Sequence, residues 1–187
     1  MKILMMLLAL ALANTAPAAP AAPADEGSVY DLESTWTNQD GAAVPLASLR
    51  GQPRIVVMFF SRCSYACPRI TSDLQKIERG LPESERSRVG FVMASFDSAR
   101  DVPSSLKAFA ETKGLAPERW LLLHGGTDQV RELAAVLNVR YRLTEEGDFD
   151  HANLITVLDA QGRIVFQREG LEGDPDEVVQ AVSALLR

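Results

Sequence analysis

The sequence predicts an α/β domain in which a central mixed sheet is flanked by helices on both faces. Between residues 54 and 137, apolar runs with strand character alternate with patterns of helical period. One antiparallel hairpin is expected before this part of the chain, and a second hairpin followed by a helix is expected after it. Strands that alternate with helices usually lie parallel, so the sheet should be parallel in its first part and antiparallel at its end.

The first 24 residues are expected to lie outside this domain. Met1-Lys2 precedes an apolar run that is followed by small-residue cleavage signals. This order is typical of a secretory signal peptide, here over residues 1–13, with residue 24 as its furthest limit. The run is shorter than the roughly 20 apolar residues that a membrane span needs. We therefore expect cleavage, a periplasmic location and no stable membrane anchor afterwards.

Residues 14–24 are almost entirely Ala and Pro, which indicates a solvated, semi-rigid linker. One folded domain then remains, over residues 25–187, and its size suits a single hydrophobic core. The whole chain has a formal net charge of −6 at pH 7, and its Lys and Arg residues are scattered. Because they form no basic cluster that could follow a phosphate backbone, a nucleic-acid partner is not expected.

The first half of the domain should contain a hairpin, a buried strand and a helix. Residues 36–46 are expected to form the hairpin, and 47–49 a single helical turn. The run 54–60 is continuously apolar after its first residue, which is typical of a strand buried on both faces of a sheet. A loop with both cysteines follows, and then a helix to about residue 80, with Pro68 expected at its first position. The apolar face of this helix comprises Ile70, Leu74 and Ile77.

The second half continues with two strands, over 88–96 and 120–123, each followed by a helix. Pro103 is expected to open the first of these helices and Thr127 to cap the second. The apolar faces of the two helices comprise Leu106, Phe109 and Ala110, and then Val130, Leu133, Ala134 and Leu137.

A polar loop over 144–151 is expected next, before the closing hairpin and the last helix. The hairpin strands are 154–158 and 163–167, and the turn sequence between them is a strong hairpin signal. Asp174 before Pro175 is a good start signal for the last helix. This order of elements is thioredoxin-like, with an N-terminal hairpin. Functional residues should gather at the C-terminal ends of the strands, where the cysteine loop and Asp97 both fall.

Cys63 and Cys67 are the only cysteines, and they lie between a buried strand and a helix. Unpaired backbone N–H groups and the helix dipole favour thiolate over thiol at such a helix N-terminus. Thiolate attacks disulfides and binds soft metals. A purely structural disulfide is the weaker interpretation, because closing a loop of about five residues contributes only about 2 kcal/mol.

One hypothesis is a thiol–disulfide oxidoreductase in which Cys63 attacks and Cys67 resolves. Two features disfavour a general enzyme of this kind. The spacing is one residue longer than C-x-x-C, and no proline lies between Pro117 and Pro175, where thioredoxin-type enzymes place a cis-proline. A peroxiredoxin-type peroxidase is disfavoured too, because Phe60 stands where its motif requires Thr.

At these positions the chain resembles the Sco/SenC family, the thioredoxin-fold copper-binding proteins of cytochrome oxidase assembly. The resemblance covers most of residues 34–186. It rests on Phe60-Ser61-Arg62-Cys63 with Cys67-Pro68, on Ser95-Phe96-Asp97 with Arg100-Asp101-Val102-Pro103, and on Asp150-His151-Ala152. Ser64 departs from the family pattern, which often has Pro directly after the first cysteine.

The resemblance implies that Cys63, Cys67 and His151 bind copper. Two thiolates and an imidazole suit Cu(I), and the imidazole can also serve Cu(II). The four-residue offset places both cysteines on one face of a helical turn. Asp150 or Asp148 would orient the imidazole. The implied function is a periplasmic metallochaperone that assists assembly of the copper centre of a cytochrome c oxidase.

The implied partners are a copper-containing oxidase subunit and a periplasmic copper donor or thiol reductant. Whether the protein also acts as an enzyme, as a thiol–disulfide reductase at the Cys63/Cys67 pair, is left open by the sequence. His124 has no motif around it and is expected to be an ordinary loop residue. Asp97 and Asp101 are expected to be caps or turn formers.

Overall fold

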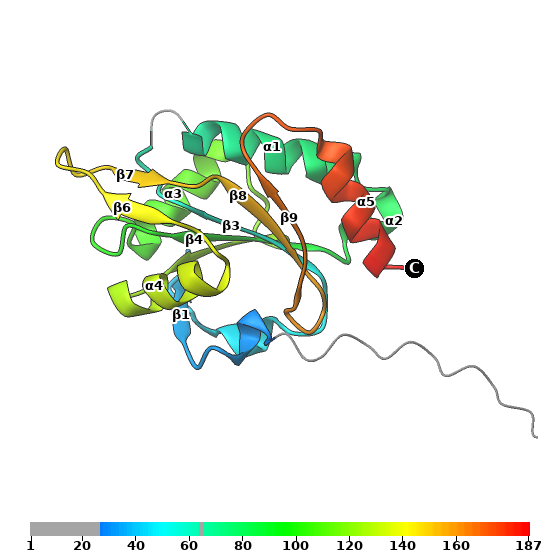
Figure 1. The fold of residues 1–187 in the computed structure, drawn as a ribbon, viewed down its shortest axis with the longest axis horizontal. Helices are drawn as coiled ribbons and strands as arrows, with labels where there is room; N and C mark the ends of the chain where they lie inside the picture. Colours follow the sequence, from blue (N-terminus) through cyan, green and yellow to red (C-terminus); the bar gives the residue numbers. More distant parts are fainter. Residues whose placement is uncertain (1–26, 64–65) are drawn as a thin grey trace, which may run out of the picture.

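The computed structural model describes residues 27–63 and 66–187, which form a seven-stranded mixed sheet with helices on both faces (Figure 1). The strand order is β2-β1-β5-β4-β3-β8-β9. Its centre is parallel and consists of β3 (Arg54–Phe59), β4 (Gly90–Ser95) and β5 (Trp120–His124). The predicted α/β class and mixed sheet are thereby confirmed. The signal peptide and linker expected over 1–24 lie outside the described residues.

The helices divide between the two faces according to the direction of their crossovers. α1 (Ala66–Gly80) joins β3 to β4, and α3 (Pro103–Lys113) joins β4 to β5. Right-handed crossovers that run in the same direction lie on the same face, and α5 (Pro175–Leu185) packs beside α1 there. α4 (Thr127–Val136) belongs to the return from β5 towards β8, and it lies on the opposite face (Figure 1).

Both predicted hairpins are present at the edges of the sheet. β1 (Thr35–Asn38) and β2 (Ala43–Pro45) form the first, and β1 also pairs antiparallel with β5. β8 (Leu154–Leu158) and β9 (Ile164–Glu169) form the second, and β8 pairs antiparallel with β3. Two short helical segments, η1 (Val29–Asp31) and η2 (Leu46–Leu49), flank the first hairpin, and α2 (Glu83–Arg86) lies between α1 and β4.

A separate two-stranded hairpin projects from one end of the sheet (Figure 1). It consists of β6 (Tyr141–Leu143) and β7 (Phe149–His151), paired antiparallel with Tyr141 opposite His151. The expectation of a polar loop throughout 144–151 is therefore wrong in its last three residues. Gly147 lies in the turn with a φ of +80°, a value that glycine adopts without strain.

The core lies between the sheet and its two helical layers. Every residue of β4 is buried, and so is β3 after its first residue. The predicted apolar face of α1 is confirmed, since Ile70, Leu74 and Ile77 are all buried. Each such side chain stabilises the fold by about 1.5–3 kcal/mol. No helix in the described part of the chain is long and apolar enough to cross a membrane.

Two helix starts differ from the sequence-based expectation. The cap of α4 is Gly126 rather than Thr127, and the Gln129 side chain accepts the N–H of Gly126 at 2.6 Å. α1 already contains Ala66 and Cys67, so Pro68 is not its first residue. The α1 difference matters for chemistry, because it places Cys67 inside the first turn of the helix.

Candidate metal centre

The carboxyl ends of β3 and β4 carry the candidate site. Cys63 follows β3 in the loop before α1, and Cys67 lies in the first turn of α1. Cys63 is partly exposed, whereas Cys67 is fully buried in the core. The structure thus gives the two thiols different access to solvent.

The two cysteines contact each other at the start of α1. The backbone N–H of Cys67 donates to Sγ of Cys63 at 3.3 Å. Sulfur in this position accepts one of the N–H groups that the first turn of a helix leaves without an intrahelical partner. Of the two cysteines, it is therefore Cys63 whose sulfur interacts with the N-terminus of α1, an interaction that the sequence predicted for the pair.

Cys67 behaves in the opposite way to the predicted activated thiolate. Its hydrogen bond with Cys63 and its burial both raise the pKa of the Cys67 thiol far above the ordinary value. The hydrogen bond with Cys63 stabilises the protonated form of Cys67, and burial disfavours the charged form. Cys67 therefore keeps its proton at neutral pH, and a soft cation would have to displace that proton in order to bind both sulfurs.

His151 is the last residue of β7, and its ring contacts two aromatic rings that follow the neighbouring strands β3 and β4. Its ring lies 5.0 Å from that of Phe96 and 5.9 Å from that of Phe60, centroid to centroid. Nδ1 of His151 lies 3.1 Å from the carbonyl oxygen of Ala152. A carbonyl only accepts hydrogen bonds, so this contact requires the proton on Nδ1. Nε2 is then left with the lone pair that a metal needs.

The group that orients His151 differs from the expected one. Asp150, which the sequence suggested for this role, forms an ion pair with Arg142 at 2.9 Å instead. Asp148 donates its backbone N–H to the hydroxyl of Thr144 at 3.3 Å. A backbone carbonyl thus replaces the predicted carboxylate as the partner that orients the imidazole.

The three predicted ligands are not assembled into one cluster. The structure brings Cys63 and Cys67 together, and it places His151 at the same end of the sheet through its contacts with Phe60 and Phe96. Within residues 27–63 and 66–187, no three His, Cys, Asp or Glu side chains converge closely enough to hold a metal ion. A shared metal would therefore require the hairpin and the cysteine loop to approach each other.

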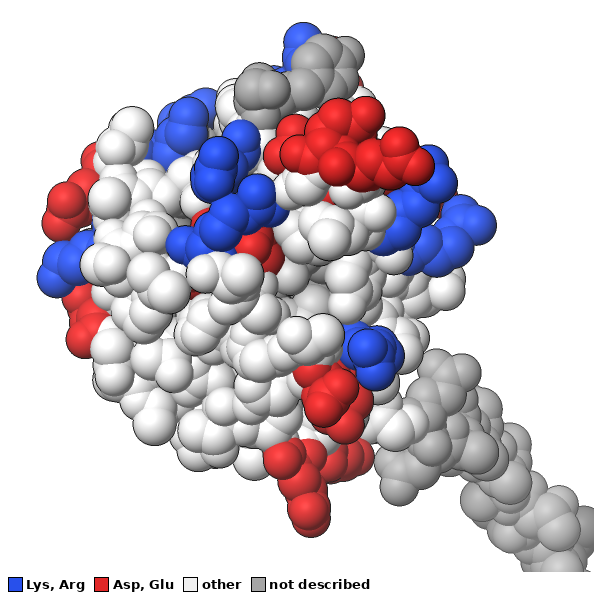
Figure 2. Space-filling view, turned by 90° about the vertical axis from the view of Figure 1, so that its left-hand side faces the viewer, with Lys and Arg blue, Asp and Glu red and all other residues white. Residues whose placement is uncertain are grey.

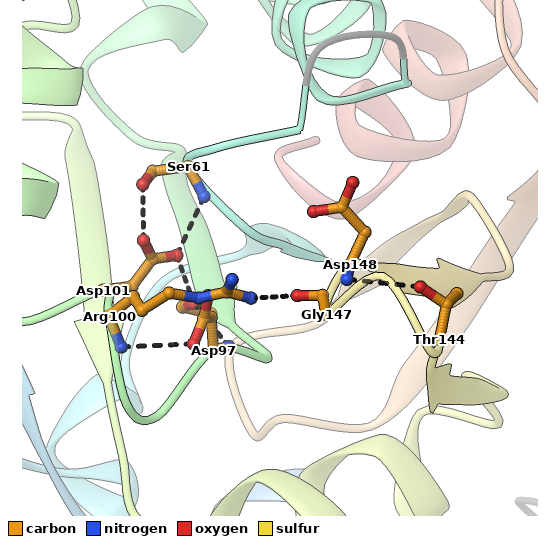
Figure 3. Close-up of polar contacts among 8 residues, drawn as sticks. Ser61, Asp97, Arg100, Asp101, Thr144, Gly147 and Asp148 are labelled. Carbon is orange, nitrogen blue, oxygen red and sulfur yellow. Dashed lines mark hydrogen bonds and ion pairs between the residues drawn. The ribbon is translucent and has the colours of Figure 1, made fainter.

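A buried carboxylate holds the strand end from which the cysteine loop departs (Figure 3). Asp101 is fully buried and accepts the backbone N–H of Ser61 at 2.8 Å. The hydroxyl of Ser61 donates to its other oxygen, and the hydroxyl of Ser95 donates at 2.5 Å. Asp101 is therefore a bridge between β4 and the cysteine loop rather than the expected cap or turn former.

A second buried carboxylate continues this polar network towards the hairpin. The backbone N–H of Asp97 donates to the Ser95 hydroxyl at 2.9 Å, and the Asp97 side chain is ion-paired with Arg100. The Arg100 guanidinium also donates to the carbonyl of Gly147 at 2.5 Å, in the turn between β6 and β7 (Figure 3). Hydrogen bonds and ion pairs thus link the cysteine loop to the hairpin of His151.

A cavity of about 430 Å³ lies beside the hairpin. Its lining is mainly apolar and comes from three elements: Phe96 after β4, Val130 on α4, and Tyr141, Leu143 and Phe149 on the hairpin. Leu143 is 63% exposed. The hairpin therefore borders a cavity, while Tyr141 and Phe149 pack against the core.

Charged side chains gather around the same end of the molecule. Seen from the side on which the hairpin projects, a group of acidic side chains lies between two groups of basic ones (Figure 2). Much of the remaining face carries few charges (Figure 2). The surroundings of the candidate site are therefore mixed in sign rather than uniformly acidic or basic.

Sequence patterns did not identify several residues that support the site. Ser61 and Ser95 are small and polar, and nothing in their spacing signals that both reach one carboxylate. The contact between Arg100 and Gly147 joins residues 47 apart in the chain. His124, the other histidine, ends β5 opposite Thr37 of β1, as a residue of the sheet rather than a loop.

The chain is similar to proteins of one family over most of its length. A family model described as SCO1/SenC matches residues 22–187. A SCO1 protein homologue from Bacillus subtilis is 26% identical over 160 residues, which cover 83% of this chain and 82% of that protein.

Solved structures of related proteins have the same fold. BsSco, described as a member of the Sco family of cytochrome c oxidase assembly proteins with a disulfide switch, is 26% identical, with a TM-score of 0.71 over 81% of this chain and 90% of that one. Copper-bound ScoI from Bradyrhizobium japonicum is 24% identical, with a TM-score of 0.68 over 81% and 96%.

Proposed function

The chain belongs to the SCO1/SenC family, and on this basis we propose that it is a copper metallochaperone. It would hold one copper ion through Cys63, Cys67 and His151 and pass it to a copper-containing subunit of a cytochrome c oxidase. The related structures with bound copper and the description of BsSco as an oxidase assembly protein support this proposal.

The observation that carries the proposal is the state of the three side chains. The side chains of Cys63 and Cys67 are already hydrogen-bonded to each other, and the imidazole donates from Nδ1, which leaves Nε2 free to coordinate. Two sulfurs and one nitrogen form a soft donor set that favours Cu(I) among biological cations. The partial exposure of Cys63 gives an acceptor protein access to the ion from one side.

The proposed site implies release of protons on binding. Cys67 is protonated in the metal-free protein, so copper must displace its proton. Affinity for Cu(I) should therefore rise with pH through the neutral range. Closure of the hairpin onto the cysteines would supply the third ligand, and reopening would return the ion to a two-sulfur site from which transfer is easier.

Chelator competition for Cu(I) tests the proposal directly. The reduced protein without residues 1–24 is titrated anaerobically against a chromogenic chelator, beside His151→Ala and Cys67→Ser. One tightly bound copper per chain is expected, with markedly weaker binding in both variants. His124→Ala is the matched control, because it removes the other imidazole of the chain. Weak wild-type binding, or equal effects of the two histidine substitutions, would exclude the three-ligand site.

A second function is favoured by the asymmetry of the cysteine pair. A partly exposed Cys63 beside a buried, protonated Cys67 is the arrangement expected of an attacking and a resolving thiol. The protein would then reduce a disulfide between the copper-site cysteines of an oxidase subunit to two thiols, while its own Cys63 and Cys67 are oxidised to a disulfide. Exchange with a small disulfide peptide measures this activity. His151→Ala should leave the exchange rate unchanged if the thiols act alone.

The proposed place of work is the periplasm. The amino-terminal pattern of one basic residue, an apolar run and small-residue cleavage signals supports export and cleavage. The mass of the protein recovered from the cell envelope tests this. We expect a mass that corresponds to a chain whose first residue lies after residue 13 and no later than residue 25. A mass that corresponds to an intact amino terminus would contradict cleavage.

A further inference from the structure

The contacts around Gly147 identify a residue that acts on the candidate site without being one of its ligands. We propose that Arg100 is a positioning residue: it fastens the β6–β7 hairpin so that His151 stays within reach of the two cysteines. This inference rests on the proposed copper site and deepens it. Arg100 itself contacts neither the sulfurs nor the imidazole in the described contacts.

The position of Arg100 is fixed at one end by a buried carboxylate. Nε of Arg100 is paired with Asp97, whose side chain is only 3% exposed. The backbone N–H of Arg100 donates to the same carboxylate at 3.1 Å. The side chain of Arg100 is 32% exposed, so water screens this pair only in part. The guanidinium is therefore held in one orientation at the end of β4.

The other end of the guanidinium reaches the hairpin. Nη2 of Arg100 donates to the Gly147 carbonyl, four residues before His151. A planar guanidinium can direct hydrogen bonds to two partners at once, and a lysine ammonium lacks that fixed fork. The turn of the hairpin is thus tied to β4, the strand that also fixes the cysteine loop through Asp101.

The rest of the contact between hairpin and domain is looser. Tyr141, Phe149 and His151 lie against the rings of Phe60 and Phe96, at centroid distances of 4.8–6.1 Å. Such ring contacts impose weak directional preferences, and the cavity beside them leaves space for movement. The directional bond from Arg100 is what limits this movement at the turn.

The consequence for copper binding is an entropic one. His151 is not assembled with the cysteines in the metal-free protein, so closure must take it from a range of positions to a single one. If His151 occupies a narrower range of positions before closure, less conformational entropy is lost when it is ordered on copper. The affinity for Cu(I) is then higher. Loss of the Arg100 bond should widen the range and weaken the copper binding that depends on His151.

A double-mutant cycle tests the proposal, with Cu(I) affinity as its readout. Arg100→Gln should weaken binding about five- to tenfold, the lower range of coupling between sites. In a His151→Ala background the same substitution should weaken binding less than twofold. Arg100→Lys should resemble Arg100→Gln, because the charge alone does not reproduce the fork. Arg142→Gln is the matched control, since it removes an exposed arginine of the same hairpin.

Amide hydrogen exchange of the metal-free protein provides a readout that does not depend on copper. Faster exchange in β6 and β7 of Arg100→Gln, with unchanged exchange in β3 and β4, is expected. Equal loss of affinity with and without His151, or tighter binding in Arg100→Gln, would overturn the proposal. If the wild type binds no copper but the hairpin exchanges faster in Arg100→Gln, the copper proposal fails and the fastening role stands.

Discussion

Individual residues at the candidate site combine burial with directed hydrogen bonds. Asp101 shows this most clearly, because a fully buried carboxylate receives three donors from two segments. The acceptor capacity of a carboxylate matches this arrangement. The side chain is therefore a fixed point between β4 and the cysteine loop, and its removal has consequences that the thiols would report.

Replacement of Asp101 by alanine should destabilise the domain strongly, whereas replacement by asparagine should destabilise it less. Asp101→Ala leaves the backbone N–H of Ser61 without an acceptor and is expected to cost about 3 kcal/mol. Asp101→Asn can still accept this N–H and donate to the Ser61 hydroxyl, so about 1 kcal/mol is expected. Urea unfolding measures both. Equal losses in the two variants would show that the network does not depend on the acceptor.

The Cys67 thiol should make stability fall at alkaline pH. Its pKa in the folded protein is raised, whereas an unfolded thiol ionises near pH 8.5. Above that pH the unfolded chain releases a proton that the folded protein keeps, so unfolding becomes more favourable as pH rises. The stabilisation is complete below about pH 8.5 and declines above it.

Cys67→Ala isolates this contribution. Between pH 8 and 10 the free energy of unfolding of the wild type should fall by about 2 kcal/mol more than that of Cys67→Ala. Urea unfolding at a series of pH values measures the difference, with Cys63 present in both proteins. Parallel pH profiles would show that Cys67 ionises normally in the folded state.

At the scale of elements, the sequence was sufficient for long segments and insufficient for short ones. β3 and β4 have continuous apolar runs, and the amphipathic face of α1 has a clear helical period. The strand β7 is only three residues long and lies among acidic residues, outside the main sheet. A short strand with one solvated face leaves too little pattern to detect.

The features of the candidate site likewise divide into those that the sequence could predict and those that it could not. The cysteine motif and His151 could be singled out from the sequence and the family resemblance. The orientation of His151 by the Ala152 carbonyl depends on how β7 leaves its hairpin, and no residue type signals it. The raised pKa of the Cys67 thiol likewise follows from the hydrogen bond with Cys63 and from burial, which are properties of the assembled structure.

The attachment of α1 to the chain before α5 also rests on buried charge. Asp73 is almost fully buried and accepts the backbone N–H of Glu172 at 2.7 Å, with Nη2 of the buried Arg168 at 4.0 Å. Lys76 also contacts it at 3.1 Å. Arg168 depends on Asp73 in this arrangement, because without the carboxylate its guanidinium charge would remain buried without an anionic neighbour.

Asp73→Asn should therefore destabilise the domain by about 3 kcal/mol, although the amide has nearly the shape of the carboxylate. Arg168 would keep its charge in a buried position without its anionic neighbour. Asp128→Asn is the matched control, since Asp128 is 89% exposed in its ion pair with Arg131. This substitution should change the free energy of unfolding by about zero. Thermal and urea unfolding measure both. Similar stability of the two variants would contradict a buried pair.

At the scale of the whole molecule, the β6–β7 hairpin is separable from the fold that supports it. Its strands belong to a sheet of their own, and the chain enters and leaves at one point, where the N–H of Ala152 donates to the Arg140 carbonyl at 2.9 Å. The seven-stranded sheet needs none of its backbone hydrogen bonds. The hairpin therefore serves the site more than the core.

Replacement of residues 141–151 by Asn-Gly should leave the domain folded. Loss of the ring contacts to Phe96 is expected to lower Tm by about 5–10 °C. Affinity for Cu(I) should fall to that of His151→Ala and no further. Calorimetry and chelator competition measure the two effects. An unfolded product would show that the hairpin is part of the core.

The place of β3 in the sheet also sets the order in which the molecule can be completed. β3 lies between β4 and β8, and Ile55 pairs with Val157, 102 residues later in the chain. As a growing chain emerges from its amino end, both cysteines appear long before the strand that closes the sheet beside them. Pairings so distant in sequence form slowly. The thiols must therefore pass through a period of exposure, to oxidants as well as to metals, before the fold protects Cys67.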